Sequence, residues 1–240
     1  VKKKATNGVI DDSLVEAESS SLQGVIHESA KNISKVLGRS SKIYNNVIKG
    51  LSRHDLSELK KNKKQISKLS SEVDNLKDKL FYFIKNLDES SLGASNFYIN
   101  LLGYLQDITQ SIEYISKVSH KHINNNHSKL TLNQIRDLLD IQKVVAEVFE
   151  SISSAFANKS FGDVKSILKD KNKTIGLLED KIETQISRTR TSEEKSPKNA
   201  ALYFSILQES KDLMKEVMNL IEEYYVSYDK SVKPAKPKDE

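Results

Sequence analysis

The sequence predicts an all-α protein of six long antiparallel helices, arranged as two tandem three-helix bundles. The 240 residues include only 8 Gly and 3 Pro, whereas average usage would give about 17 and about 12. Turns must therefore be few, which argues against a β-sandwich or barrel, because such folds need turn residues about every 8–12 positions. Apolar residues also recur at intervals of three and four through the middle of the chain, as amphipathic helices require.

The two ends of the chain are expected to be tails. Residues 1–12 contain three consecutive lysines, and residues 229–240 contain four lysines and two prolines. Neither segment carries an apolar stripe that would hold it on a core. We therefore place the folded part between residues 13 and 228.

The first half of the folded part, residues 13–120, contains three predicted helices. A capping box, in which a Ser, Thr or Asp side chain pairs with a Glu three residues later, precedes the first helix at Ser13 and the second at Asp55. The third helix follows the turn-rich segment 88–96 and ends in the asparagines 124–126. These signals predict a first bundle with short connections.

The second half, residues 130–228, contains the other three predicted helices. The fourth begins near Thr131, and the fifth, capped by Ser160, is predicted as one helix that continues through Ile186. The sixth has Ser196 as N-cap and a proline at its first position, where the missing N–H costs nothing. We expect this half to form the second bundle.

The two halves resemble each other in sequence. A shift of 105 residues superimposes apolar and polar positions of the third helix on those of the sixth, and a shift of 102 residues does so for the second and fifth. The matched polar pairs are Tyr98 with Tyr203, Asp107 with Asp212, Asp78 with Asp180, and Lys79 with Lys181. Such offsets indicate an internal duplication, although helical stripes also align by chance.

Composition excludes several classes of function. The chain has no Cys, so disulfides, thiolate metal sites and cysteine nucleophiles are excluded. The common nucleotide-binding and metalloprotease motifs are absent as well, and we expect neither an enzyme nor a cofactor. The net charge of +5 comes from 38 basic and 33 acidic residues, a mixed surface that does not indicate nucleic-acid binding. Without a long apolar run, the fragment is expected to be soluble.

Two clusters have both a functional and a structural interpretation. Imidazoles are common metal ligands, but three histidines at the end of the third helix fit a solvated helix end better than a metal site: His120, His122 and His127. A basic run on the second helix fits a solvated face better than a phosphate or lipid contact: Lys60, Lys61, Lys63 and Lys64.

Other residues are given structural interpretations. Asp137 and Asp140 are predicted to be surface residues. The three tyrosines that close the sixth helix are expected to pack on the core, with the hydroxyl groups near water; they are Tyr224, Tyr225 and Tyr228.

The third and sixth helices carry the motif that suggests a family. Segments 98–108 (Tyr-x-x-Leu-Leu-x-x-Leu-Gln-Asp-Ile) and 203–213 (Tyr-Phe-x-Ile-Leu-x-x-Ser-Lys-Asp-Leu) resemble the PhoU family of phosphate-uptake regulators. Segments 106–111 and 207–213 are similar to the soluble C-terminal extension of some bacterial inorganic phosphate permeases. The resemblance covers about residues 18–226.

The resemblance implies a scaffold with an altered site. In the PhoU family, the carboxylates of a Glu-x-x-x-Asp motif hold iron or zinc. On this alignment Gln106 and Gln110 stand at those places in the first half, and Lys211 and Lys215 in the second. Amides are poor ligands for these metals, and an ammonium group has no free lone pair. The resemblance therefore implies no metal, and leaves these four residues as the candidate contact face.

The function implied is a non-catalytic regulatory domain of an inorganic phosphate transporter, on the cytoplasmic side of the bacterial inner membrane. The expected partner is the membrane domain of the permease, encoded upstream of Val1 in the same chain, with the lysines 2–4 as positive-inside residues. A second copy of the chain, and phosphate or another anion, are further partners to consider. The alternative is a generic helical scaffold or adaptor that mediates protein–protein contacts.

Overall fold

The structure, a computed structural model, describes residues 22–85, 92–159, 161 and 164–228. Both predicted tails lie outside these ranges. The described regular structure is α-helical, as predicted, and none of its helices is both long and apolar enough to cross a bilayer. The helices are α1 (Leu22–Ser52), α2 (Leu56–Lys85), α3 (Leu92–Asn124), α4 (Leu132–Asn158), α5 (Val164–Lys169), α6 (Lys171–Arg190) and α7 (Pro197–Ser227).

The predicted start signals of three helices are confirmed. The Asp55 side chain accepts a hydrogen bond from the backbone N–H of Glu58 at the start of α2 (3.0 Å). Thr131 forms a complete capping box before α4, and Ser196 caps α7 with Pro197 directly after it. The signals at Ser13 and Ser160 lie outside the described residues.

The fifth predicted helix is not continuous, which corrects the sequence analysis. It is divided at Asp170, whose N–H bonds the carbonyl of Ile167 (3.2 Å) in a tight turn between α5 and α6. Residues 169–174 are all polar, so over one and a half turns no apolar side chain ties the backbone to the core. A continuous helix would therefore gain little stabilisation from packing at these residues, and the chain turns at Asp170 instead.

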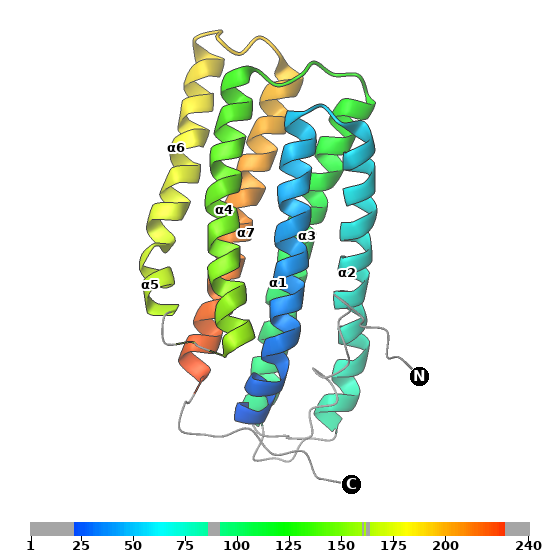
Figure 1. The fold of residues 1–240 in the computed structure, drawn as a ribbon, viewed down its shortest axis with the longest axis vertical. Helices are drawn as coiled ribbons and strands as arrows, with labels where there is room; N and C mark the ends of the chain where they lie inside the picture. Colours follow the sequence, from blue (N-terminus) through cyan, green and yellow to red (C-terminus); the bar gives the residue numbers. More distant parts are fainter. Residues whose placement is uncertain (1–21, 86–91, 160, 162–163, 229–240) are drawn as a thin grey trace.

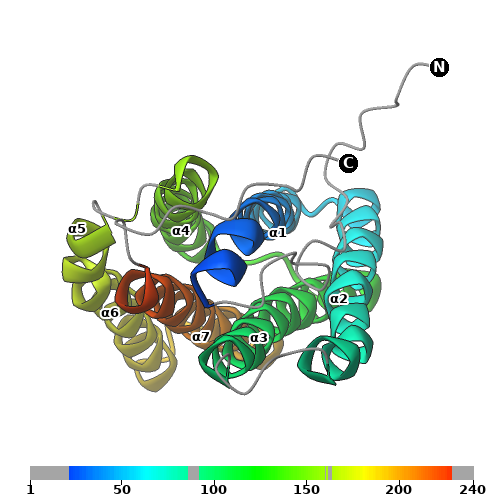
Figure 2. The ribbon, with the colours of Figure 1, turned by 90° about the horizontal axis from the view of Figure 1, so that it is seen from below.

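The long helices lie side by side, and consecutive long helices run antiparallel, whereas the short α5 leads into α6 in the same direction (Figure 1). Seen along the bundle, α4 and α1 form one row, while α6, α7 and α3 form a second row beneath it (Figure 2). α2 covers the edge and contacts both α1 and α3. The extensive contacts of α1 with α4 and of α3 with α7 join residues that are far apart in the sequence.

One hydrophobic core runs through both predicted halves. The buried apolar residues of α1–α3 and of α4–α7 belong to a single contiguous cluster. Four fully buried tyrosines lie within it: Tyr44, Tyr98, Tyr203 and Tyr224. The division into two bundles, residues 13–120 and 130–228, stays a prediction, and the structure adds that the halves share their core.

Candidate functional site

The structure does not bring the four predicted contact residues onto one face. Gln106 of α3 is buried, and its Nε2 donates to Asp74 Oδ1 of α2 (3.0 Å). Lys211 of α7 lies on another side, with Nζ 4.0 Å from Glu179 Oε1 of α6. Because α2 and α6 flank the α3–α7 pair on opposite sides (Figure 2), these two side chains point apart.

The other two members, Gln110 and Lys215, are exposed. The groups that do meet across α3 and α7 lie one residue further along each helix. Glu216 of α7 lies close enough to Asp107 of α3, and to Asp212, for their charges to raise its pKa. A shift of one position thus places a carboxylate after Gln106, Lys211 and Lys215, and a serine, Ser111, after Gln110.

These carboxylates form an acidic seam along the α3–α7 contact, consisting of Asp107, Glu209, Asp212 and Glu216. Burial raises the pKa of Glu216, and the negative charges of Asp107 and Asp212 raise it further. Burial and Asp212 also raise the pKa of Glu209, against a hydrogen bond with Ser111 that lowers it. Burial is thus the larger cause of the raised pKa of both groups, and the neighbouring negative charges add to it.

We predict that Glu216→Gln raises the free energy of unfolding at pH 7 by about 0.5–1 kcal/mol, the size of a partly exposed charge interaction. A raised pKa means that the folded state favours the protonated carboxyl group. Its stabilising contribution is complete below the unfolded pKa and is lost as the pH rises through the folded pKa. Urea unfolding at pH 7 and pH 3.5 should show the gain of the variant at pH 7 only.

Glu222→Gln is the control for this prediction, because Glu222 is an exposed carboxylate on the same helix. It should change stability by less than about 0.5 kcal/mol at either pH. A Glu216→Gln protein that is less stable than the parent at pH 7 would contradict the assignment of repulsion to the seam.

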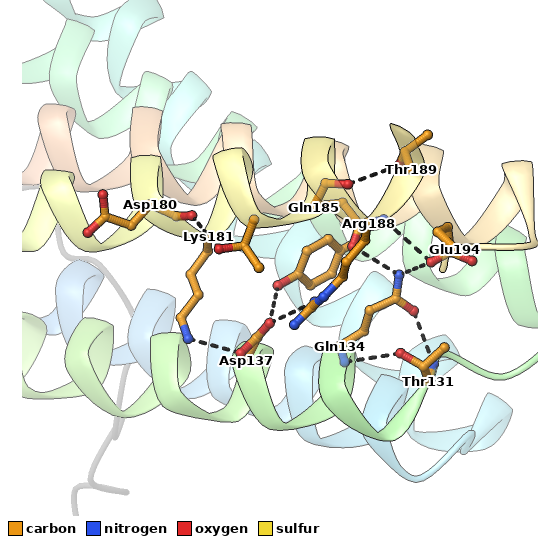
Figure 3. A network of polar contacts seen from close by, with 11 residues as sticks. Thr131, Gln134, Asp137, Asp180, Lys181, Gln185, Arg188, Thr189 and Glu194 are labelled. Carbon is orange, nitrogen blue, oxygen red and sulfur yellow. Dashed lines mark hydrogen bonds and ion pairs between the residues drawn. The ribbon is translucent and has the colours of Figure 1, made fainter. Parts of the chain in front are cut away.

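A second polar site surrounds Asp137, near the start of α4 (Figure 3). Its Oδ1 accepts a hydrogen bond from Lys181 Nζ (2.9 Å), and its Oδ2 accepts from Arg188 Nη1 (3.0 Å) and Tyr203 Oη (3.0 Å). Asp137 is only 8% exposed. The prediction that it is a surface residue is therefore wrong, whereas Asp140 is exposed as predicted.

The partners of Asp137 keep its carboxylate charged. Burial alone would raise its pKa, but the hydrogen bonds from Lys181, Arg188 and Tyr203 outweigh burial and lower it. Burial and the negative charge of Asp137 raise the pKa of Tyr203, so its hydroxyl keeps the proton that it donates. With every charge paired, the site ties α4 to α6 and α7 and leaves no free acid or base.

An amide cluster extends the Asp137 site toward the end of the bundle (Figure 3). The Gln134 amide donates to Gln185 Oε1 (3.4 Å) and to Glu194, and Gln185 is fully buried. Gln134 also completes the capping box with Thr131. The same side chains thus start α4 and fix it against the end of α6.

Two buried polar residues of the first half occupy positions that match Asp137 and Tyr203 in sequence. Asn32 and Tyr98 are fully buried, and each lies 105 residues before its match, Asp137 and Tyr203. Both positions therefore follow the offset of the apparent repeat.

Of the three histidines at and just after the end of α3, two have neighbouring rings. His122 Nε2 lies 2.9 Å from the backbone oxygen of Ser128, and its ring centroid lies 5.1 Å from that of His127. Within the described ranges, no group of three or more His, Cys, Asp and Glu side chains is arranged to hold a metal ion. The histidine cluster therefore offers no metal geometry in this part of the chain.

The basic run at the start of α2 is exposed at all four positions. Burial lowers the pKa of His120, and the charges of Lys63 and Lys60 lower it further, so this part of α3 lies beside the run. The exposure agrees with the interpretation of a solvated helix face.

The fold and its sites define an all-α helical bundle with a paired buried charge network and an acidic seam. Comparisons with protein-family models, with curated proteins and with solved structures find no match to this chain. The function is therefore argued from the residues themselves.

Proposed function

We propose that this chain is a non-catalytic regulatory domain of an inorganic phosphate permease, which acts at the cytoplasmic side of the bacterial inner membrane by contact with the membrane domain. The observation that carries the proposal is the position of the two segments that resemble the PhoU family. Residues 98–108 and 203–213 are far apart in sequence, yet they lie in the two helices α3 and α7, which pack against each other. The two motif segments therefore lie in one pair of packed helices.

The polar interior supports a scaffold role. The Tyr44 and Ser210 hydroxyls hydrogen-bond each other between α1 and α7 (2.9 Å), and those of Ser29 and Tyr224 do the same further along these helices. Asp137 is bound by three donors. These buried groups connect helices, and their polar atoms bind one another. A catalytic acid or base, by contrast, must be able to reach a substrate.

The acidic seam suggests the chemistry of the contact. The cytoplasmic loops of membrane proteins carry an excess of Lys and Arg, and such loops would relieve the repulsion within the seam. A coupling of about 1–3 kcal/mol between domain and transporter is typical of regulation between two sites. Pairing a few of the crowded carboxylates with basic side chains can supply energies of this order.

The test uses the full-length permease that contains this chain. Deletion of residues 13–228 should alter phosphate uptake, or its response to phosphate supply, while membrane insertion stays intact. The double variant Asp212→Lys/Glu216→Lys should reproduce the regulatory part of this effect. The control is Asp140→Lys/Glu147→Lys, which changes the charge by the same amount at two exposed positions of α4 and should leave uptake as in the parent.

Unchanged uptake and unchanged regulation in the deletion would overturn the proposal. The alternative, a helical scaffold or adaptor for other proteins, would then account for the fold. An effect of the control variant equal to that of the seam variant would overturn the assignment of the contact to α3 and α7.

A further inference from the structure

A polar groove lies between α1 and α4, away from both sites described above. It has a volume of about 410 Å³. Its walls combine two lysines and one carboxylate with amide and hydroxyl groups from both helices. The lining residues are Gly38, Ser41, Lys42, Asn45, Asn46 and Lys49 of α1, and Phe149, Glu150, Ser153 and Ser154 of α4.

Contacts between the two helices hold the groove in shape. Ser34 Oγ donates to the backbone oxygen of Ser153 (3.1 Å), and Gln142 Nε2 donates to Asn45 Oδ1 (3.1 Å). The second bond leaves the amide hydrogens of Asn45 available as donors. Gly38 keeps space open in the wall, since a Cβ atom at this position would meet nothing within 4 Å. The cavity is therefore built by fixed helices.

The groove contains two lysines, Lys42 and Lys49, beside the single carboxylate of Glu150. Lys42 and Lys49 are exposed and lie two helical turns apart, about 10 Å along α1. Neither pairs with a carboxylate in the part of the chain that the structure describes. Ammonium groups, amide N–H groups and hydroxyls on one surface are the donors that bind a phosphate group.

We propose that this groove binds a small phosphate monoester whose organic part carries hydroxyl groups, the chemistry of a sugar phosphate or a nucleotide. Its volume falls in the range of about 300–1,000 Å³ that is typical of small-molecule sites, and a phosphate ion alone would leave most of it empty. Glu150 repels the phosphate group of either ligand, but it accepts hydrogen bonds from the hydroxyl groups that only the organic part of the ester carries. The lysines therefore bind the phosphate, and Glu150 selects the ester.

The position of the groove suggests what the ligand does. α1 belongs to the first half of the chain and α4 to the second, so a ligand that contacts both stabilises their packing. This binding proposal stands independently of the proposed transporter role and is tested on the 240-residue chain itself. If the transporter role also holds, the ester is a candidate signal for the domain.

The test is calorimetric titration of the purified chain with ribose 5-phosphate, AMP and inorganic phosphate. The esters should bind at least tenfold more tightly than inorganic phosphate, and more weakly as salt rises. Lys42→Gln/Lys49→Gln should weaken ester binding tenfold or more. The control is Lys61→Gln/Lys68→Gln, which removes two exposed lysines of the same spacing from α2 and should leave affinity unchanged.

A second variant tests the groove without removing a charge. Gly38→Leu fills the open space and should abolish ester binding, while its thermal unfolding reports an intact fold. Gly176→Leu, at an equally open helical glycine of α6, should bind as the parent does. Three results would overturn the proposal: no ester binding at millimolar concentration, inorganic phosphate bound as tightly as the esters, or full ester binding by Gly38→Leu.

Discussion

Tyr224→Ala is expected to lower the free energy of unfolding by about 4 kcal/mol, in the range measured for large aromatic residues replaced by alanine in cores. Tyr224 is fully buried near the end of α7. Its ring lies edge-on to Phe97 of α3 (centroids 5.0 Å apart) and Phe156 of α4 (4.4 Å), and stacks on Phe161 (5.5 Å). Truncation leaves a cavity where three segments meet. Urea unfolding, followed by circular dichroism, measures the loss.

Two further variants show which part of Tyr224 contributes. Tyr224→Phe keeps the ring and removes the hydroxyl bond to Ser29, so it should cost only about 1 kcal/mol. Tyr225→Ala changes the neighbouring residue, which is 39% exposed, and should cost less than about 1 kcal/mol. Equal losses for Tyr224→Ala and Tyr225→Ala would contradict the placement of Tyr224 in the core.

Asp137→Ala is expected to lower the free energy of unfolding by about 3 kcal/mol. The substitution removes the carboxylate that two partly buried cations, Lys181 and Arg188, and the Tyr203 hydroxyl share. The effect should depend on pH. Since the pKa of Asp137 is lowered in the folded state, its stabilisation is present above the unfolded pKa and is lost as the pH falls through the folded pKa. Urea unfolding at pH 7 and pH 2.5 should therefore show a smaller cost in acid.

Asp140→Ala is the matched control, since it removes an exposed carboxylate one turn further along α4. It should change stability by less than about 0.5 kcal/mol. If Asp137→Ala were as mild as Asp140→Ala, the ion pairs drawn in Figure 3 would contribute nothing to the fold.

The helices could be predicted because their signals are local. A capping side chain such as Thr131 or Ser196 acts within one turn, and the apolar stripe of each helix consists of residues of that helix alone. The apolar stripe does not predict the break at Asp170, although its cause is also local, because the apolar residues on either side of the polar run 169–174 keep the helical spacing. The absence of anchoring apolar residues over more than one turn is the signal that would have found it.

The candidate site was harder to predict because it depends on rotation and on distant partners. One residue step turns a helix by about 100°, so Gln106 and Asp107 face different neighbours, and an alignment shifted by one position selects the wrong side. The partners of Asp137 lie 44, 51 and 66 residues away, beyond any local pattern. The equal offset of Asn32 and Tyr98 from Asp137 and Tyr203 was the signal available for this site.

The first residue of α1 and the last residue of α7 lie at the same end of the bundle (Figure 1), where Ser29 and Tyr224 connect the two helices. A mechanical pull between Leu22 and Ser227 would thus break the contacts between helices one after another, starting from that end. It would not shear the full length of the bundle at once. Tension applied at these two points therefore reaches the aromatic cluster around Tyr224 first, and the opposite end, with the Asp137 site, last.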